Sequence, residues 1–310
     1  MRALFVLNPY ESRRFIAKAV ARLPEVKKAK EEGEIVIAHG STNVYVAEEI
    51  LGRSPYPPDK FLSGLVVNRV LCTTEMGEKP PLVMIRKGEL ILPELTMEET
   101  LKNFDSESIF IKGANAVDAE GNAGIFVAHP SGGTMGYAYS ILSARGCRII
   151  TPVGLEKLIP SVKKTSQHCG QDTFYYCQGI RIGMIPMMNA KVITEVESFR
   201  ILLGLEAIHI GSGGVNGSEG SVVMVAEGGK EELDRAIQLI ESIKGEPPLH
   251  PRKSLCVTCP PPPRGSGPRV SPRDPITGEE IKHCIYHGKK EEELPPYLQQ
   301  RVSKQEILKD

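Results

Sequence analysis

The hydrophobic and polar positions near the N-terminus form helical faces and short continuous apolar runs. Apolar side chains between residues 12 and 23 recur on one helical face, whereas residues 35–38 are apolar without interruption. A second helical pattern over 43–51 follows that run and ends at Gly52. Because continuous runs are typical of strands buried on both faces, we predict an open, mostly parallel sheet with helices on both faces.

The same alternation continues along the chain. Apolar runs at 109–111, 124–128 and 148–151 predict three more strands, and a glycine loop leads into a predicted helix over 137–144. Strands that alternate with helices indicate the α/β class. We therefore assign residues 1–190 to one α/β domain.

The pattern changes after that domain. Strands predicted at 207–210 and 221–226 lie between two predicted helices, which favours a small ferredoxin-like α+β domain over 191–248. Residues 249–310 contain the proline-dense stretch CPPPPRGSGP. We expect this Pro/Cys-rich segment to be extended or irregular.

Composition restricts the class of partner. The 38 lysine and arginine residues balance 38 aspartate and glutamate residues, aromatic residues make up 5%, and tryptophan is absent. A balanced charge and few aromatic rings argue against a nucleic-acid partner. No apolar run has the length of a signal peptide or a membrane span, so we expect a cytoplasmic protein with no membrane partner. The sequence has seven cysteines, and we recognise no export signal in it, which argues against a disulfide framework.

The first candidate site lies where the strand predicted at 35–38 runs into His39-Gly40-Ser41-Thr42-Asn43. The N–H groups at the start of the following helix and its dipole favour an anion at this point. Gly40 lets the backbone approach a ligand closely, and the Ser41 and Thr42 hydroxyls can donate to the same oxygens. The alternative is that these small residues only form a tight turn and a helix cap.

A second strand, glycine loop and helix repeat this arrangement at residues 129–136, HPSGGTMG. Parallel strands end at the same edge of a sheet, where open α/β sheets bind ligands. We therefore predict that both loops and the turn after residue 111 face one cleft. The candidate ligand-binding residues beyond the first loop are Gly113, Ala114, Asn115, Ser131, Gly132, Gly133 and Thr134.

Two of these stretches resemble known proteins. GEIVIAHGSTNVYVAEEIL is similar to the phosphate loop of ribose-5-phosphate isomerase, in which a strand ends in Gly-Ser-Thr before a helix. FIKGANAVDAEGNAG resembles a segment of the methylthioribose-1-phosphate isomerase and initiation-factor-2B-like branch. Over residues 12–160 the chain thus resembles the ribose-5-phosphate isomerase, glucosamine-6-phosphate deaminase and CoA-transferase-like superfamily. The resemblance implies a sheet that binds phosphosugars, CoA esters or nucleotide-like ligands at its strand ends.

The chain departs from the isomerase pattern at its acidic positions. Where that segment reads Asp-Gly-Ala-Asp-Glu, this chain has Lys112, Gly113, Ala114, Asn115 and Ala116. Proton transfer needs a titratable group within hydrogen-bond reach of the substrate. The loss of both acids therefore makes ribose-5-phosphate isomerase activity doubtful.

The remaining candidates for catalysis are His39, His129, Asp118 and Lys112. Both histidines directly precede a glycine loop, where each is either a base or a neutral hydrogen-bonding residue. Asp118 lies in a turn with Glu120, so the alternative is that both only form the turn. Lys112 follows a strand and could balance the charge of a phosphate or pair with a carboxylate.

Two functions follow, from different classes. The first is an enzyme that binds and converts a small phosphorylated or CoA-linked metabolite by isomerase-like or CoA/acyl-transfer chemistry. The second is a non-catalytic metabolite sensor or assembly subunit on the same fold, which the missing acids favour. The histidines beside the loops favour the first, so whether the protein is an enzyme stays open. We infer no organic cofactor and allow for a homo-oligomer.

Cysteine spacing predicts a metal site in the C-terminal segment. Cys256, Cys259, Cys284 and His287 form a C-x2-C and C-x2-H arrangement, which suits a closed, structural zinc site. His283 competes with His287 as the fourth ligand. The alternative is a flexible tail that binds no metal.

Overall fold

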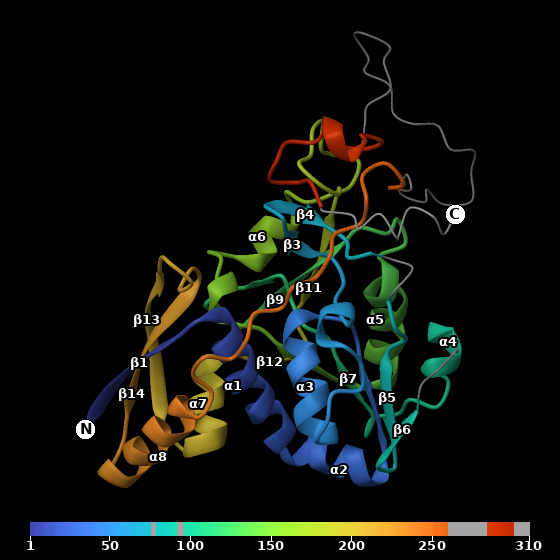
Figure 1. The fold of residues 1–310 in the computed structure, drawn as a ribbon. Helices are drawn as coiled ribbons and strands as arrows, with labels where there is room; N and C mark the ends of the chain where they lie inside the picture. Colours follow the sequence, from blue (N-terminus) through green and yellow to red (C-terminus); the bar gives the residue numbers. More distant parts are fainter. Residues whose placement is uncertain (76–78, 92–95, 260–283, 301–310) are drawn as a thin grey trace.

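The computed structural model describes residues 1–75, 79–91, 96–259 and 284–300. It is a mixed α/β protein with a large mixed sheet and several helices (Figure 1). The predicted α/β class is therefore confirmed. The described residues contain no helix that is both long enough and apolar enough to cross a membrane.

The large sheet has six strands, in the order β12-β10-β7-β2-β5-β6. Four neighbouring strands are parallel, β5 is antiparallel to them, and β6 is antiparallel to β5. The parallel strands are β2 (Glu34–Ile37), β7 (Ile109–Ile111), β10 (Arg148–Pro152) and β12 (Lys191–Ile193); the other two are β5 (Val83–Arg86) and β6 (Glu89–Ile91). The sheet is thus mixed, with a parallel half that positions the candidate site.

Both faces of the large sheet are covered, which explains the continuous apolar runs of its strands. Successive side chains of a strand point to opposite faces. Ile35 and Ile109 pack with the helices on one face, whereas Val36 and Phe110 pack with the helix and strands on the other. The helices on the first face are α1 (Pro9–Arg22), α2 (Pro24–Glu32) and α3 (Ser41–Leu51), and the helix on the second face is α5 (Gly133–Arg145).

The strand predicted at 124–128 forms, but outside the parallel sheet. It is β9 (Ala123–Val127), which pairs antiparallel with β8 (Ala116–Val117) and β11 (Gly183–Met187). Asp118 N–H donates to Asn122 O over 3.0 Å, so a tight hairpin joins β8 to β9. A direct hairpin fixes the two strands as antiparallel, because a parallel pair needs a long crossover.

A small antiparallel sheet has the order β1-β14-β13, with β1 (Arg2–Leu7), β14 (Ser221–Glu227) and β13 (Glu206–Gly213). Helices α7 (Glu195–Leu203) and α8 (Lys230–Glu241) pack into the same core as its inner face. β1 precedes the boundary predicted at residue 190 but pairs with β14, which follows it. β12 follows that boundary but pairs with β10, which precedes it. The domain division and the ferredoxin-like outline stay predictions.

The remaining elements are short. The hairpin of β3 (Leu65–Val67) and β4 (Val70–Cys72) lies at the end of the molecule opposite α2, and the described residues after α8 reach it (Figure 1). The short helices are α4 (Met97–Thr100), α6 (Val162–Ser166) and the 3-10 turns η1 (Pro58–Lys60), η2 (Leu155–Lys157) and η3 (Glu291–Glu293).

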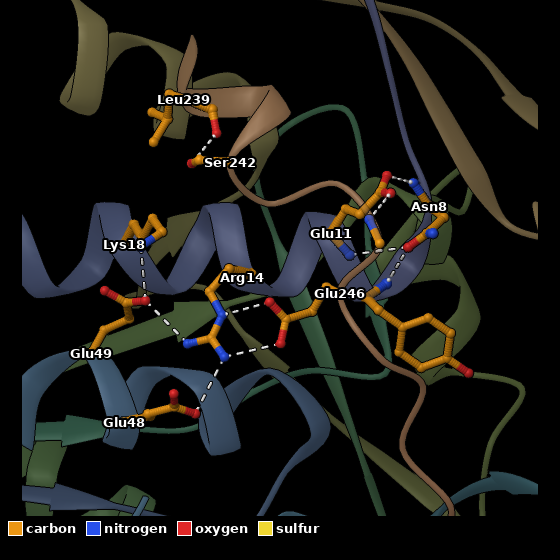
Figure 2. A network of polar contacts seen from close by, with 11 residues as sticks. Asn8, Glu11, Arg14, Lys18, Glu48, Glu49, Leu239, Ser242 and Glu246 are labelled. Atoms are coloured by element: carbon orange, nitrogen blue, oxygen red, sulfur yellow. Dashed lines mark hydrogen bonds and ion pairs between the residues drawn. The ribbon is translucent and has the colours of Figure 1, made fainter. Parts of the chain in front are cut away.

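An ion-pair network joins the chain after α8 to α1 and α3 (Figure 2). The Arg14 guanidinium on α1 donates to both oxygens of Glu246, over 2.9 and 3.0 Å. It also donates to Glu49 over 3.1 Å and to Glu48 over 3.2 Å. Because the Arg14 side chain is only 11% exposed, these contacts tie the two sheets together from a largely buried position.

Candidate functional site

The four parallel strands end at one edge of the large sheet, and charged residues follow each strand end. His39 follows β2, Lys112 follows β7, Lys157 lies in the turn η2 after β10, and Glu195 opens α7 after β12. Open α/β sheets bind ligands at this edge. The candidate site therefore comprises the residues at these four strand ends.

Lys112 is partly buried, and its Nζ donates to His39 O over 3.0 Å. Burial lowers the pKa of Lys112 to about 8, and the charges of Lys79 and Lys157 act in the same direction. The charged groups that act on this ammonium are thus both cations. Such a group is stabilised by an anion that enters between them.

Lys157 reaches the same turn from β10. Its Nζ donates to Ala114 O over 3.1 Å, and burial lowers its pKa although Glu156 acts in the opposite direction. Lys157 Nζ lies 3.9 Å from Glu156 Oε1, beyond hydrogen-bond distance. The β7 turn therefore has an ammonium on each side, from Lys112 and from Lys157.

The start of α3 forms the third side of this edge. Val44 N–H makes the first intrahelical bond, to Gly40 O over 3.1 Å, and no side chain caps the helix. The N–H groups of the first turn therefore have no acceptor within the helix. Ser41 is partly exposed, whereas Thr42 is only 2% exposed, so Ser41 is the better placed of the two predicted hydroxyl donors.

Asn43 is fully buried between the ends of β2 and β7. Its Nδ2 donates to Ala38 O over 2.6 Å and to Ile111 O over 3.3 Å, which orients the amide. Asn43 Oδ1 accepts no hydrogen bond within the described residues. This oxygen is itself buried, and a Cβ at Gly113 would make an ordinary van der Waals contact with it, at 3.7 Å.

His39 is held as a hydrogen-bonding residue. Its Nε2 lies 2.7 Å from Pro80 O, a carbonyl that only accepts, so Nε2 carries the proton. Burial, helped by the charges of Lys79 and Lys112, lowers the pKa of His39 to about 4, although the hydrogen bond to Pro80 acts in the opposite direction. The ring is therefore neutral at pH 7, which favours the neutral alternative over a base.

Two carboxylates that the sequence interpretation missed complete the edge. Glu195 is fully buried, and one oxygen accepts the Leu155 N–H over 2.9 Å. Burial, and next the charge of Glu156, raises the pKa of Glu195 to about 7. Glu156 itself lies 3.6 Å from Arg13. The only signal in the sequence is that both acids closely follow apolar runs, in RIITPVGLEK and KVITE.

The second glycine loop follows β9, a strand that pairs outside the parallel sheet. A Cβ at Gly136 would lie 1.9 Å from Ser131 O, and Gly132 has a φ of 78°. These glycines therefore let the loop fold closely onto the first turn of α5, whose first two residues are Gly133 and Thr134.

The polar residues of this loop serve its own fold. The exposed His129 accepts a bond from Ser131 N–H through Nδ1, and Gln171 Nε2 donates to His129 O over 3.0 Å. These contacts tie the loop to itself and to Gln171. They favour the tight-turn alternative for this second loop.

Asp118 and Asn115 hold the β8–β9 hairpin. Asp118 accepts bonds from Val162, Asn122 and Glu120 N–H groups. Burial alone would raise the pKa of Asp118, but these bonds hold it below its usual range. Asn115 Oδ1 accepts the Phe126 N–H over 3.0 Å. The contacts of both residues are those of turn formers, the alternative recognised in the sequence for Asp118.

A cavity of about 510 Å³ lies at the opposite edge, where the parallel strands begin. Its charged walls are already paired: Lys28 bonds Glu107 over 2.8 Å, and Arg86 bonds Glu34 over 2.5 Å. These pairs leave no single sign of charge to select a ligand. The carboxyl edge, with its cluster of cations, is the better candidate.

The predicted zinc ligands Cys256, Cys259, Cys284 and His287 lie in the described residues, whereas His283 lies outside them. All seven cysteines are described, and none forms a disulfide. Within the described residues, no three His, Cys, Asp or Glu side chains already surround one point as metal ligands.

Comparison with protein-family models, with curated proteins and with solved structures finds no match for this chain.

Proposed function

We propose that the carboxyl edge of the parallel strands binds a small phosphorylated metabolite. The observation that carries the proposal is the Lys112 ammonium, which is partly buried beside two further lysines instead of a carboxylate. A phosphate between Lys112 and Lys157 would also face the N–H groups at the start of α3. The resemblance of the Gly-Ser-Thr stretch to a phosphate loop supports the same kind of ligand.

A sugar phosphate suits this edge better than phosphate alone. The Gly40-Ser41-Thr42 stretch resembles the phosphate loop of ribose-5-phosphate isomerase, which supports a sugar phosphate as the ligand. A CoA ester also carries phosphates, so it is kept as a separate arm of the binding test. A cytoplasmic setting is part of this proposal.

Conversion of the bound metabolite is the second candidate function. Glu195 has a pKa near neutral pH and shares its surroundings with Glu156, so this pair could hold or release one proton near pH 7. That observation favours an enzyme. The absence of an acid at Asn115 favours a sensor. Formation of product from a bound sugar phosphate, and its loss in a Glu195→Gln variant that still binds, would separate the two.

Replacement of Lys112 by methionine is expected to weaken binding of ribose 5-phosphate at least about tenfold, because a hydrogen bond to a charged group contributes about 1.5–3 kcal/mol. The measurement is calorimetric titration with inorganic phosphate, ribose 5-phosphate and acetyl-CoA. Lys27→Met is the matched control, because Lys27 is exposed on α2 at the other end of the strands. Equal affinities in both variants would contradict the proposal.

The same site predicts how binding depends on pH. An anion needs the protonated form of Lys112, so the affinity should fall as pH rises through about 8. Lys112→Arg keeps its charge at these pH values, so its affinity should change less between pH 7 and 9. An identical pH profile in wild type and Lys112→Arg would remove Lys112 from the site.

We also propose that the chain forms a homo-oligomer through the outer face of the small sheet. Leu4 and Ile208 are 62% and 59% exposed on this face, and both lie opposite Val225. The apolar centre of this face is bordered by the charged residues Arg2, Glu206 and Glu227, and an apolar patch of this kind packs against its own copy across a two-fold axis. Light scattering should give twice the monomer mass, and Ile208→Lys should return it to the monomer. Val66→Lys, at a 70% exposed position on β3, is the control. A monomeric wild type would refute this.

A further inference from the structure

Three separate stretches of the chain bring four cysteines to the β3–β4 hairpin. Cys72 is the last residue of β4, Cys256 and Cys259 follow α8, and Cys284 begins the described turn at 284–288. In Figure 1 these stretches gather at the end of the molecule opposite α2. We call Cys72, Cys256, Cys259 and Cys284 the four-cysteine cluster.

The two turns that carry Cys256 and Cys284 are hydrogen-bonded to each other. Gly288 N–H donates to Cys256 O over 2.8 Å, and Cys259 N–H donates to the same oxygen over 3.4 Å. In the second turn, Tyr286 N–H is directed at Cys284 Sγ over 3.4 Å. This backbone hydrogen bond fixes the Cys284 side chain within its turn.

A short antiparallel pairing brings Cys72 to the same place. Thr74 pairs with Lys253, and Ser254 N–H donates to Thr73 O over 3.0 Å. The side chains of Cys72, Cys256 and Cys284 pack against one small apolar cluster. The members of that cluster are Val70, Tyr286, Leu294 and Leu298. Burial is the largest cause of the raised pKa of the Cys259 thiol. The next causes are the charges of Cys72, Cys284 and Cys256, so the other three sulfurs lie close enough to act on it.

A buried lysine lies among these sulfurs. Lys253 is 1% exposed, and its Nζ lies 3.5 Å from Cys256 Sγ and 3.4 Å from Ser254 O. A buried ammonium is costly unless negative charge lies beside it. Thiolates bound to a divalent metal carry that charge, so the lysine and the cysteines suit one metal centre.

We propose that Cys72, Cys256, Cys259 and Cys284 bind one zinc ion. Four thiolates are a common ligand set for tetrahedral, structural zinc, and four protein ligands leave no open position for catalysis. Rotation about χ1 moves each sulfur without moving the backbone, so the side chains can converge on the ion. The ion would fasten both later stretches of chain to the β3–β4 hairpin.

This ligand set replaces His287, which sequence spacing predicts, by Cys72. His287 N–H donates to Cys284 O over 3.0 Å, so this residue closes its own turn. Cys72 shares the apolar cluster with Cys256 and Cys284. Spacing could not identify Cys72, because it lies far from the other three in the sequence.

The first test is zinc content of the full chain, purified without chelator and measured by mass spectrometry. We expect about one zinc per chain in the wild type and at least a tenfold loss in Cys72→Ser and Cys284→Ser. Cys177→Ser and His287→Ala should keep the zinc. Cys177 is the matched control, because its carbonyl accepts the Ile285 N–H over 3.1 Å beside the same turn.

A second variant separates a ligand from a residue needed only for folding. Cys72→His offers another zinc ligand and should recover most of the zinc that Cys72→Ser loses. If Cys72→Ser does not fold, the visible spectrum of the Co²⁺-loaded wild type decides, since four thiolates and three thiolates with one imidazole differ in their bands. The four-thiolate spectrum is the expected result.

Three results would overturn the proposal. A wild type without zinc would remove the site, and an iron-containing protein would refute the choice of metal. Loss of zinc in His287→Ala or Cys177→Ser, with retention in Cys72→Ser, would assign the fourth position to that other residue.

Discussion

Replacement of Arg14 by methionine is expected to lower the free energy of unfolding by about 3 kcal/mol at pH 7. The Arg14 side chain is 11% exposed and pairs with Glu246, Glu49 and Glu48 (Figure 2). Without the guanidinium, Glu246 and Glu48 lose their Arg14 partner, and Glu49 keeps only Lys18, at 3.1 Å. Removal of one partner from a buried ion pair typically costs about 3–5 kcal/mol, and the residual exposure here places the effect at the lower end.

Urea unfolding of Arg14→Met and of two further variants checks this expectation. Arg235→Met is the matched control, because Arg235 is 62% exposed and its pair with Glu232 spans 3.7 Å. Exposed pairs contribute about 0–1 kcal/mol, so this control should unfold near the wild type. In the Glu246→Gln background, replacement of Arg14 should lower the free energy of unfolding by less, because Arg14 then pairs with one carboxylate fewer. A difference between Arg14→Met and Arg235→Met below about 1 kcal/mol would refute the structural role of the network.

The elements that the sequence predicted well have strong local signals. The predicted strand at 109–111 coincides with β7, because a fully buried strand needs an uninterrupted apolar run. The predicted helix at 43–51 ends at the predicted Gly52, whose φ of 74° is the left-handed cap that glycine favours. α1 begins at Pro9 instead of after Ser12, because Asn8 and Glu11 form a capping box that the apolar pattern does not reveal.

Strand partners could not be predicted in the same way. β9 has the composition of a parallel strand, but the hairpin turn at Asp118–Asn122 makes it antiparallel. β1 pairs with β14 from the other end of the chain, and no residue in either strand specifies the other. Register and partner depend on tertiary packing, which a local period of hydrophobic residues does not contain.

The candidate site was predicted in part for a related reason. The residues after β2 and β7 stood out because Gly40, Ser41 and Gly113 form recognisable turns. Lys157 and Glu195 follow β10 and β12 as single charged residues, which in sequence are indistinguishable from a solvated surface. Only their burial at one sheet edge changes their pKa values and makes them candidates for chemistry.

Replacement of Glu195 by glutamine is expected to raise the free energy of unfolding by about 3 kcal/mol above pH 7, and to have little effect near pH 4. Burial raises the pKa of Glu195 from 4.5 to about 7. Between these pH values the folded chain binds one proton more than the unfolded chain, so wild-type stability falls as pH rises through this window. Glutamine has no proton to lose, and therefore its stability stays constant where that of the wild type falls.

The measurement is urea unfolding of the wild type and the variants at several pH values between 4.5 and 8.5. Glu241→Gln, at an exposed position of α8, is the control and should follow the wild-type profile. Glu156→Gln should move the fall in stability to lower pH, because the charge of Glu156 contributes to the raised pKa of Glu195. The glutamine amide at position 195 also keeps an oxygen for the Leu155 N–H, so the variant loses no acceptor there. If Glu195→Gln and the wild type keep the same difference in stability at pH 5 and pH 8, Glu195 does not titrate in this window, and its part in proton transfer is refuted.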